Sequence, residues 1–180
     1  MNRRQALLLM TSQAGFFLLA INGFAAQESK TPEVGKIKLY SAEAGDYIMT
    51  DRVVHTPAEW RKLLTADQYH VLREAGTERA FTGKLLNNKQ HGVYRCAACG
   101  NDLYLSDHKF DSGTGWPSYY QAIAPENISI QEDHGFFVTR NELICRRCES
   151  HLGHVFDDGP PPTGKRHCIN SISLTFKQLD

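Results

Sequence analysis

Residues 92–105 have the sequence GVYRCAACGNDLYL, in which two short apolar runs flank a Cys-x-x-Cys pair. The first run begins at Val93, the second ends at Leu105, and Gly100 lies between them. Runs of this composition, bounded by Gly, Asn and Asp, predict two β-strands joined by a turn. Because no helical spacing of apolar residues competes here, the stretch predicts β-structure with two thiols beside the turn.

The same pattern continues through the C-terminal half of the chain. Short runs at 128–130 and 136–139 are bounded by turn residues and predict further strands. Residues 168–176 alternate, so a single strand there would place five side chains on one face: Cys168, Asn170, Ile172, Leu174 and Phe176. The domain is therefore predicted to be mainly antiparallel β.

Two short helices are predicted ahead of these strands. Residues 56–59 (TPAE) supply a capping threonine, a proline at the first helical position and a glutamate that completes a capping box. Residues 65–68 (TADQ) repeat this arrangement, and Gly76 is expected to end the second helix. The apolar stripe of the two helices would consist of Trp60, Leu63, Leu64, Tyr69 and Leu72.

The N-terminus resembles a targeting segment rather than part of the fold. Residues 1–25 combine Arg3 and Arg4, a mostly apolar stretch and the small residues Gly23 and Ala25, which is the order of a secretory signal peptide. The pattern predicts export to the bacterial periplasm, and the arginine pair also resembles a twin-arginine signal. An uncleaved leader that anchors the protein in the membrane is the alternative; with cleavage, membrane contact would be transient. Residues 26–45 are predicted to be a linker or arm, and 46–180 the folded domain.

The composition is that of an ordinary globular protein. Of the 180 residues, 41% are hydrophobic and 22% are charged, with 20 Lys plus Arg against 20 Asp plus Glu. A protein that binds nucleic acid through its phosphates needs a basic face, and the sequence has no basic run of that kind. Nucleic acid is therefore not expected as a partner.

Four of the five cysteines form two Cys-x-x-Cys pairs, Cys96 with Cys99 and Cys145 with Cys148. Four thiolates can complete a tetrahedral shell around Zn²⁺, and a fully ligated zinc has no open position for catalysis. The pairs therefore predict one structural zinc ion per chain that ties distant strands together. Two disulfides in an oxidising compartment are an alternative. A thioredoxin-like redox pair is another, although no βαβ pattern surrounds either pair.

The fifth cysteine, Cys168, has no partner of this kind. A free cysteine is often a buried apolar residue, but an odd cysteine in an exported protein also suggests a reactive thiol. On a regular strand, Arg166 and Asn170 would point to the same side as Cys168. A guanidinium beside a thiol favours the thiolate, so Arg166 is expected to lower the pKa of Cys168.

Four segments of the chain resemble the methionine-R-sulfoxide reductase family. Residues 166–171 (RHCINS) are similar to its nucleophile segment, and 111–118 (DSGTGWPS) and 151–156 (HLGHVF) to two other signature segments. Residues 76–83 (GTERAFTG) resemble a fourth, with Ala80 in place of the usual Pro. The likeness covers about 60–176. It implies two packed antiparallel sheets, a β-tent-like fold, with structural zinc held by the four paired cysteines.

The resemblance also implies a reaction and roles for named residues. Cys168 would attack the sulfoxide sulfur, His151 and His154 would hold or protonate the departing oxygen, and Asn170 would assist. Arg166 would support the thiolate. Trp116 would form the apolar wall that receives the substrate methyl group, with Phe156 behind it. His134 and His167 have no implied role and are expected to be surface or local residues.

Thr114 departs from the family pattern, because many relatives carry a second, resolving cysteine there. The chain has five cysteines and no sixth. The resemblance therefore implies a one-cysteine cycle in which a small thiol or a thioredoxin-like reductant attacks the Cys168 sulfenic acid, with oxidised proteins or peptides as substrates. Two rival hypotheses are a zinc-pinned binding module of the same fold without activity and a general thiol–disulfide exchange enzyme.

Overall fold

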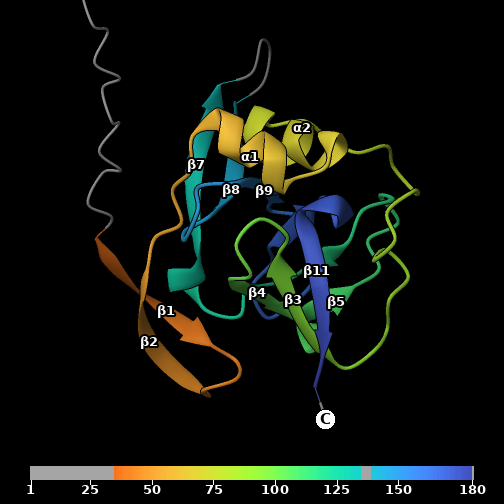
Figure 1. Cartoon of the computed structure of the whole chain (residues 1–180). Helices are drawn as coiled ribbons and strands as arrows, with labels where there is room; N and C mark the ends of the chain where they lie inside the picture. The colour runs from red at the N-terminus through yellow and green to blue at the C-terminus, as the bar shows by residue number, and fades with distance from the viewer. Residues whose placement is uncertain (1–34, 135–138, 180) are drawn as a thin grey trace, which may run out of the picture. The chain divides into compact units, whose positions relative to one another are not determined.

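The computed structural model describes residues 35–134 and 139–179, which form three antiparallel sheets and two α-helices (Figure 1). The expected signal peptide and residues 136–138 of one predicted strand lie outside the described residues. The largest sheet has six strands in the order β5 (Lys109–Phe110), β6 (Ser118–Tyr119), β10 (Arg166–Ile169), β9 (His151–Phe156), β8 (Thr139–Cys145) and β7 (Ile128–His134). The second contains β11 (Leu174–Gln178), β3 (Gly92–Cys96) and β4 (Asp102–Leu105), and the third pairs β1 (Lys36–Ser41) with β2 (Asp46–Asp51). The mainly antiparallel β prediction is confirmed.

Aromatic side chains from the two larger sheets build the core between them. Tyr104 of β4 stacks on Tyr119 of β6 with 4.2 Å between ring centroids, and Tyr94 of β3 meets Tyr119 edge-on at 5.2 Å. All three are fully buried, and Leu143, Leu152 and Ile169 of the larger sheet belong to the same apolar cluster. Interlocked aromatic side chains therefore hold the sheets in the relative position that the site requires.

The two predicted helices are present as α1 (Pro57–Leu63) and α2 (Ala66–Glu74), each with a complete capping box. Two details differ from the prediction. Leu63 is 60% exposed, because it faces away from the stripe that buries Trp60 and Leu72. The left-handed residue at the end of α2 is Ala75, with φ 53°, while the Gly76 N–H donates to the His70 carbonyl at 3.0 Å.

The segment expected to be a linker or arm contains strand β1, and Asp46, where the folded domain was expected to begin, is the first residue of β2 and pairs with Ser41 of β1. Leu39 is only 2% exposed. The buried Asn127 accepts from the Tyr40 N–H and donates to the Tyr40 carbonyl, both at 2.8 Å, and also donates to the Asp102 carbonyl. One buried amide thus ties β1 to the domain.

The single strand predicted over 168–176 is wrong. Strand β10 ends at Ile169, and a 3₁₀ turn over Ser171–Ser173 separates it from β11. The Glu78 carboxylate accepts from the backbone N–H groups of Ser171 and Ile172 at 2.5 and 3.0 Å, which replaces strand pairing at this point. Further 3₁₀ turns lie at Ser106–His108 and Pro125–Asn127. Among the described residues, no helix is both long and apolar enough to cross a membrane.

Candidate active site and metal centre

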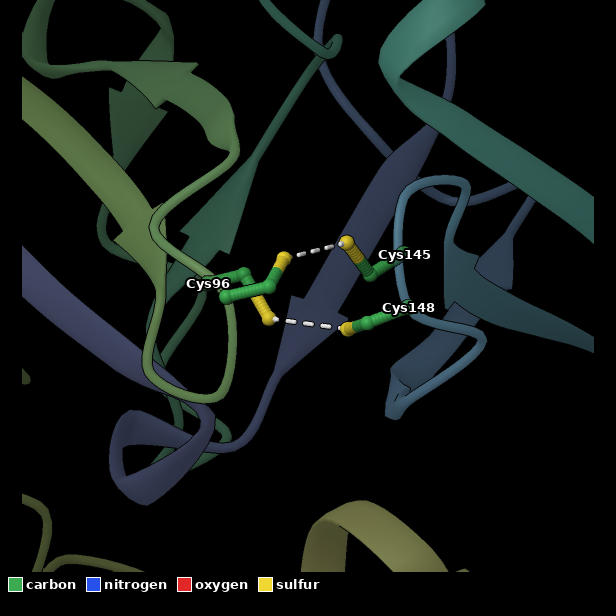
Figure 2. Close-up of side chains that lie close together, drawn as sticks. Cys96, Cys145 and Cys148 are labelled. Atoms are coloured by element: carbon green, nitrogen blue, oxygen red, sulfur yellow. Dashed lines mark hydrogen bonds between the residues drawn. The ribbon is translucent and has the colours of Figure 1, made fainter. Parts of the chain in front are cut away.

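The two Cys-x-x-Cys pairs occupy equivalent turns, one after β3 and one after β8. In each turn the residue after the second cysteine is left-handed, Gly100 with φ 73° and Glu149 with φ 58°. Their N–H groups donate to the carbonyls of Cys96 and Cys145, both at 2.8 Å. The two turns face each other, so thiols from distant parts of the chain converge on one point (Figure 2).

The sulfur positions fit a tetrahedral metal ion. All four Sγ atoms lie within 4.8 Å of one another, with 3.7 Å between Cys96 and Cys148 and 3.6 Å between Cys99 and Cys145. A Zn–S bond of about 2.3 Å in a tetrahedron places sulfurs about 3.8 Å apart. A disulfide would need about 2.05 Å, and all five cysteines are free thiols here. The geometry therefore favours the metal site over the two-disulfide alternative.

The charge balance of this cluster also calls for a cation. Hydrogen bonding with Cys145 raises the pKa of the Cys96 and Cys99 thiols, whereas hydrogen bonding with Cys145 lowers that of Cys148. Four thiolates gathered this closely repel one another, and a bound cation would offset their charge. Asn101 donates to Cys145 Sγ at 3.5 Å, and Ser150 Oγ lies 3.2 Å from Cys148 Sγ.

The nucleophile candidate lies in a different region, on the face of the six-stranded sheet. The strand register places Cys168 of β10 opposite His154 of β9, and His154 opposite Glu142 of β8. Directly opposed residues have Cβ atoms about 5 Å apart and point to the same face. One row across three strands therefore brings a thiol, an imidazole and a carboxylate together.

His151 joins this face because β9 contains a bulge. Leu143 pairs with Gly153 but Ile144 pairs with His151, so Leu152 is an extra residue in β9. In a regular strand, residues three apart point to opposite faces. The bulge changes the alternation, and the rings of His151 and His154 lie 5.3 Å apart.

A small cavity of about 130 Å³ opens at Cys168. Of the residues predicted from the sequence, it is lined by Cys168, His154, Asn170, Trp116 and Phe156. Thr77 and Arg140 also line it, although the sequence analysis did not select them. His151 and Arg166 are not among its lining residues, so any role of these two in the reaction passes through their neighbours.

Trp116 is held at the cavity by a loop with two left-handed glycines, Gly113 and Gly115. Its indole Nε1–H donates to the Glu78 carbonyl at 3.1 Å, which fixes the ring plane. Thr114 Oγ1 of the same loop lies 4.0 Å from Cys168 Sγ. The loop therefore supplies both an apolar wall and a hydroxyl beside the thiol.

Arg166 is engaged by a residue that the sequence analysis missed. Its guanidinium donates to both carboxylate oxygens of Asp158, at 2.9 and 2.8 Å, and lies 4.4 Å from the centroid of the Phe156 ring.

Burial raises the pKa of Cys168, and this outweighs the lowering effects of Thr114 and Arg166. Arg166 thus lowers the pKa of the thiol as expected, but desolvation of the thiolate is the larger effect and the net shift is upward.

Each histidine of the pair has its own carboxylate partner. Glu142 Oε1 lies 2.6 Å from His151 Nδ1, and Asp133 Oδ2 lies 3.2 Å from His154 Nε2. Arg140 donates to the same Asp133 oxygen at 2.8 Å. These carboxylates and Arg140 come from β7 and β8, and no local sequence signal marks them.

Asn170 and His167 are both engaged by side chains or backbone groups from other parts of the chain. The Asn170 amide accepts from the Glu78 N–H at 3.0 Å and donates to the Leu152 carbonyl at 3.1 Å, so it links the 3₁₀ turn to the segment before it. His167 is not a surface residue: Tyr104 hydroxyl lies 3.1 Å from its Nδ1, and burial lowers its pKa to about 4. His134 is the last residue of β7.

The described residues define a mainly antiparallel β-protein of three sheets, with a four-cysteine cluster whose geometry fits a metal ion and a separate half-buried thiol. The family profile described as "SelR domain" matches residues 64–178, and the chain belongs to this family.

Three relatives carry the name peptide methionine sulfoxide reductase MsrB. The protein from Methanosarcina barkeri is 61% identical over 119 residues, covering 66% of this chain and 84% of that protein. The protein from Methanosarcina mazei is 54% identical over 126 residues, covering 70% and 90%. The protein from Thiobacillus denitrificans is 55% identical over 125 residues, covering 69% and 95%.

Proposed function

We propose that this protein is a peptide methionine sulfoxide reductase that returns the R epimer of methionine sulfoxide in proteins to methionine. Family membership and the names of its relatives support the reaction. The observation that carries the proposal is that Cys168, His154 and Trp116 line one cavity of about 130 Å³. Such a cavity suits a single side chain and offers a nucleophile, a proton-exchanging group and an apolar wall together.

The reaction begins with proton transfer, because the buried Cys168 is a thiol at neutral pH. Sγ attacks the sulfoxide sulfur while the oxygen receives the thiol proton by way of a neighbouring group, and His154 is the titratable residue that lines the cavity beside Cys168. The hydroxyl group then moves from the substrate sulfur to Sγ while the sulfur–sulfur bond breaks, so methionine leaves and Cys168 becomes a sulfenic acid. The charge of His151, adjacent to His154, lowers the pKa of His154. Asn170 lines the cavity and is held there by its hydrogen bond to the Leu152 carbonyl.

The sulfenic acid then needs two electrons from outside the chain. The other four cysteines are gathered in the metal centre, so none remains to form an internal disulfide with Cys168. A small thiol or thioredoxin-like dithiol attacks Cys168 Sγ and water is released. A second thiol then resolves the mixed disulfide and regenerates the Cys168 thiol.

Substrate orientation follows from the cavity walls. Trp116 and Phe156 present apolar surface that receives the methyl group of the sulfoxide. The Phe156 ring is fixed from behind by the Arg166–Asp158 pair. With the methyl group against these rings and the sulfur at Cys168, only one configuration at sulfur directs the oxygen toward His154, which supports selection of a single epimer.

The four paired cysteines would hold one Zn²⁺ per chain. Zinc with four protein thiolates supplies structural stability and no open coordination position. It would join the turn after β3 to the turn after β8, and no step of the reaction involves it. The alternative of an inactive zinc-pinned binding module keeps this same metal site.

Export to the periplasm is a further part of the proposal. The leader-like order of residues 1–25 supports it. Expression of the full chain in a bacterium, followed by fractionation and N-terminal sequencing, tests it. A shortened N-terminus in the periplasmic fraction is expected. A full-length product in the membrane fraction would favour the anchored alternative, and one in the cytoplasm would contradict export.

The reaction is tested with separate R and S epimers of a methionine sulfoxide peptide in the presence of dithiothreitol. We expect reduction of the R epimer alone and complete loss in Cys168→Ser. If folded, zinc-loaded protein reduces neither epimer, the binding-module hypothesis becomes the better explanation. Reduction of disulfides at a comparable rate would instead favour the thiol–disulfide exchange hypothesis.

A further inference from the structure

The β7–β8 hairpin delivers an ion pair to the histidine beside the nucleophile. Asp133 of β7 is opposite Arg140 of β8 in the strand register, and the Arg140 guanidinium donates to Asp133 Oδ2 at 2.8 Å. The same oxygen lies 3.2 Å from His154 Nε2. Arg140 also lines the Cys168 cavity. Strands β7 and β8, which carry no sequence motif, thus reach His154 through one atom, Asp133 Oδ2.

This contact determines which His154 nitrogen carries the proton. Hydrogen bonds from Arg140 and then His154 hold the pKa of Asp133 below its ordinary value, so the carboxylate is ionised and only accepts hydrogen bonds. Nε2 must then be the protonated nitrogen, which leaves Nδ1 as the one that exchanges a proton during the reaction. His151 has the reverse arrangement, because its carboxylate partner faces Nδ1.

We propose that Asp133, anchored by Arg140, is a positioning residue that fixes the tautomer and ring orientation of His154. The inference rests on the proposed reductase function and deepens it. Cys168, His154 and Asp133 then stand in the order nucleophile, proton carrier and orienting carboxylate, which is the general logic of activated nucleophiles. Asp133 acts through His154 and does not touch the reacting atoms.

The charged groups around His154 determine how the Asp133–Arg140 ion pair affects the pKa of His154. His151 lies beside it on β9, Glu142 and Arg140 face it from β8, Asp133 from β7, and Cys168 from β10, where Arg166 is opposite Phe156. Burial lowers the pKa of His154, the Asp133 hydrogen bond opposes this, and the charges of Arg140 and His151 lower it further. Loss of the Asp133 charge should therefore lower the His154 pKa further still.

The test compares Asp133→Ala and Asp133→Asn in the full chain, with Asp157→Asn as a control of equal charge change. Asp157 is 79% exposed and pairs with Lys165 rather than with His154. ¹⁵N NMR of the histidine rings reports the tautomers, and the His151 signals serve as an internal standard. We expect wild-type His154 to show the Nε2–H tautomer and Asp133→Ala to show a mixture of both.

Kinetics give the second readout. General acid–base catalysis contributes about 10²–10⁴-fold, so loss of orientation in Asp133→Ala should lower kcat about 10–100-fold with little change in KM. Asp133→Asn keeps an acceptor oxygen and should lose less activity. The acid limb of its pH profile should move to lower pH, because the imidazolium form has lost its anion.

Three results would overturn the inference. One is a wild-type tautomer and wild-type kcat in Asp133→Ala. Another is an equal loss of kcat in Asp157→Asn, which would indicate a general charge effect. If loss of activity comes with a lower melting temperature and shifted His151 signals, Asp133 is a structural residue and the inference also fails. The NMR measurement needs no substrate, so failure of the proposed reaction and failure of the positioning role are distinguishable.

Discussion

Removal of the metal from the four-cysteine centre should destabilise the domain by an amount that the loop length sets. The link between Cys96 and Cys148 closes a segment of 52 residues. Closing a loop of that length lowers the entropy of the unfolded chain and stabilises the folded state by about 4 kcal/mol.

A loss of this size should be visible as a large shift in melting temperature. For a domain of this length, 1 kcal/mol corresponds to about 2–4 °C, so we expect a decrease of about 8–16 °C. The measurement is thermal unfolding by circular dichroism before and after chelation, in a phosphine reductant that prevents disulfide formation. Metal content by mass spectrometry should fall from one zinc per chain to zero. Cys168→Ser, measured in parallel, separates metal loss from reactions of the nucleophile.

The reasoning would be refuted if complete metal loss, verified by mass spectrometry, changed the melting temperature by no more than a degree or two. A purified protein that never contained metal, yet melted as a single stable domain, would refute it too. Recovery of the original melting temperature on addition of zinc is expected, because the two cysteine turns have the same backbone geometry and form from local sequence.

Three further predictions test separate parts of the structure. Thr114→Cys should give the enzyme an internal disulfide after one turnover, because Thr114 Oγ1 lies 4.0 Å from Cys168 Sγ. Mass spectrometry should find the disulfide in the variant and a trappable sulfenic acid in the wild type. A sulfenic acid in both proteins would contradict this prediction. Alkylation of Cys168 without substrate should keep accelerating above pH 9, because burial raises the thiol pKa above its ordinary 9.0 and the thiolate fraction grows with pH. Arg166→Gln should move that midpoint higher still, and a midpoint below neutrality in the wild type would show that Arg166 and Thr114 outweigh burial. Ala75→Gly should stabilise the domain by about 0.5–1 kcal/mol in chemical unfolding, because Ala75 has a left-handed φ of 53° that glycine adopts without strain; a loss of stability would show that the alanine methyl group packs usefully.

Local sequence signals predicted the parts of the fold that local interactions determine. Both capping boxes formed where Thr56 and Thr65 predicted them, because a threonine hydroxyl and a side chain three residues later satisfy the first N–H groups of a helix. The two cysteine turns are similar, since spacing alone brings each pair of thiols together. The prediction failed at Asn170, where the alternation of apolar residues indicated one strand. Glu78 redirects the chain there, because its carboxylate accepts a hydrogen bond from the Ser171 N–H, 93 positions later in the sequence.

The candidate site shows the same division between local and distant causes. Cys168, Trp116 and His154 could be selected from the sequence because their residue types are unusual in their settings or resemble a family pattern. Asp158, Asp133 and Arg140 are common charged residues, and their importance comes from the residues that the fold places beside them. Asp133 reaches His154 only because β7, β8 and β9 are neighbours in the sheet. No property of the residues near Asp133 in sequence indicates that pairing.

The bulge at Leu152 connects the fold to the chemistry most directly. Without it, His151 and His154 would point to opposite faces of β9, and only one could lie beside Cys168. The extra residue also requires a close approach, because a Cβ at Gly153 would lie 2.0 Å from the Cys168 carbonyl oxygen. A side chain at position 153 would therefore push β9 and β10 apart and separate His154 from the thiol. The spacing of the two histidines and the glycine between them are therefore required together. The spacing places both rings on one face, and the glycine lets β9 lie close to β10.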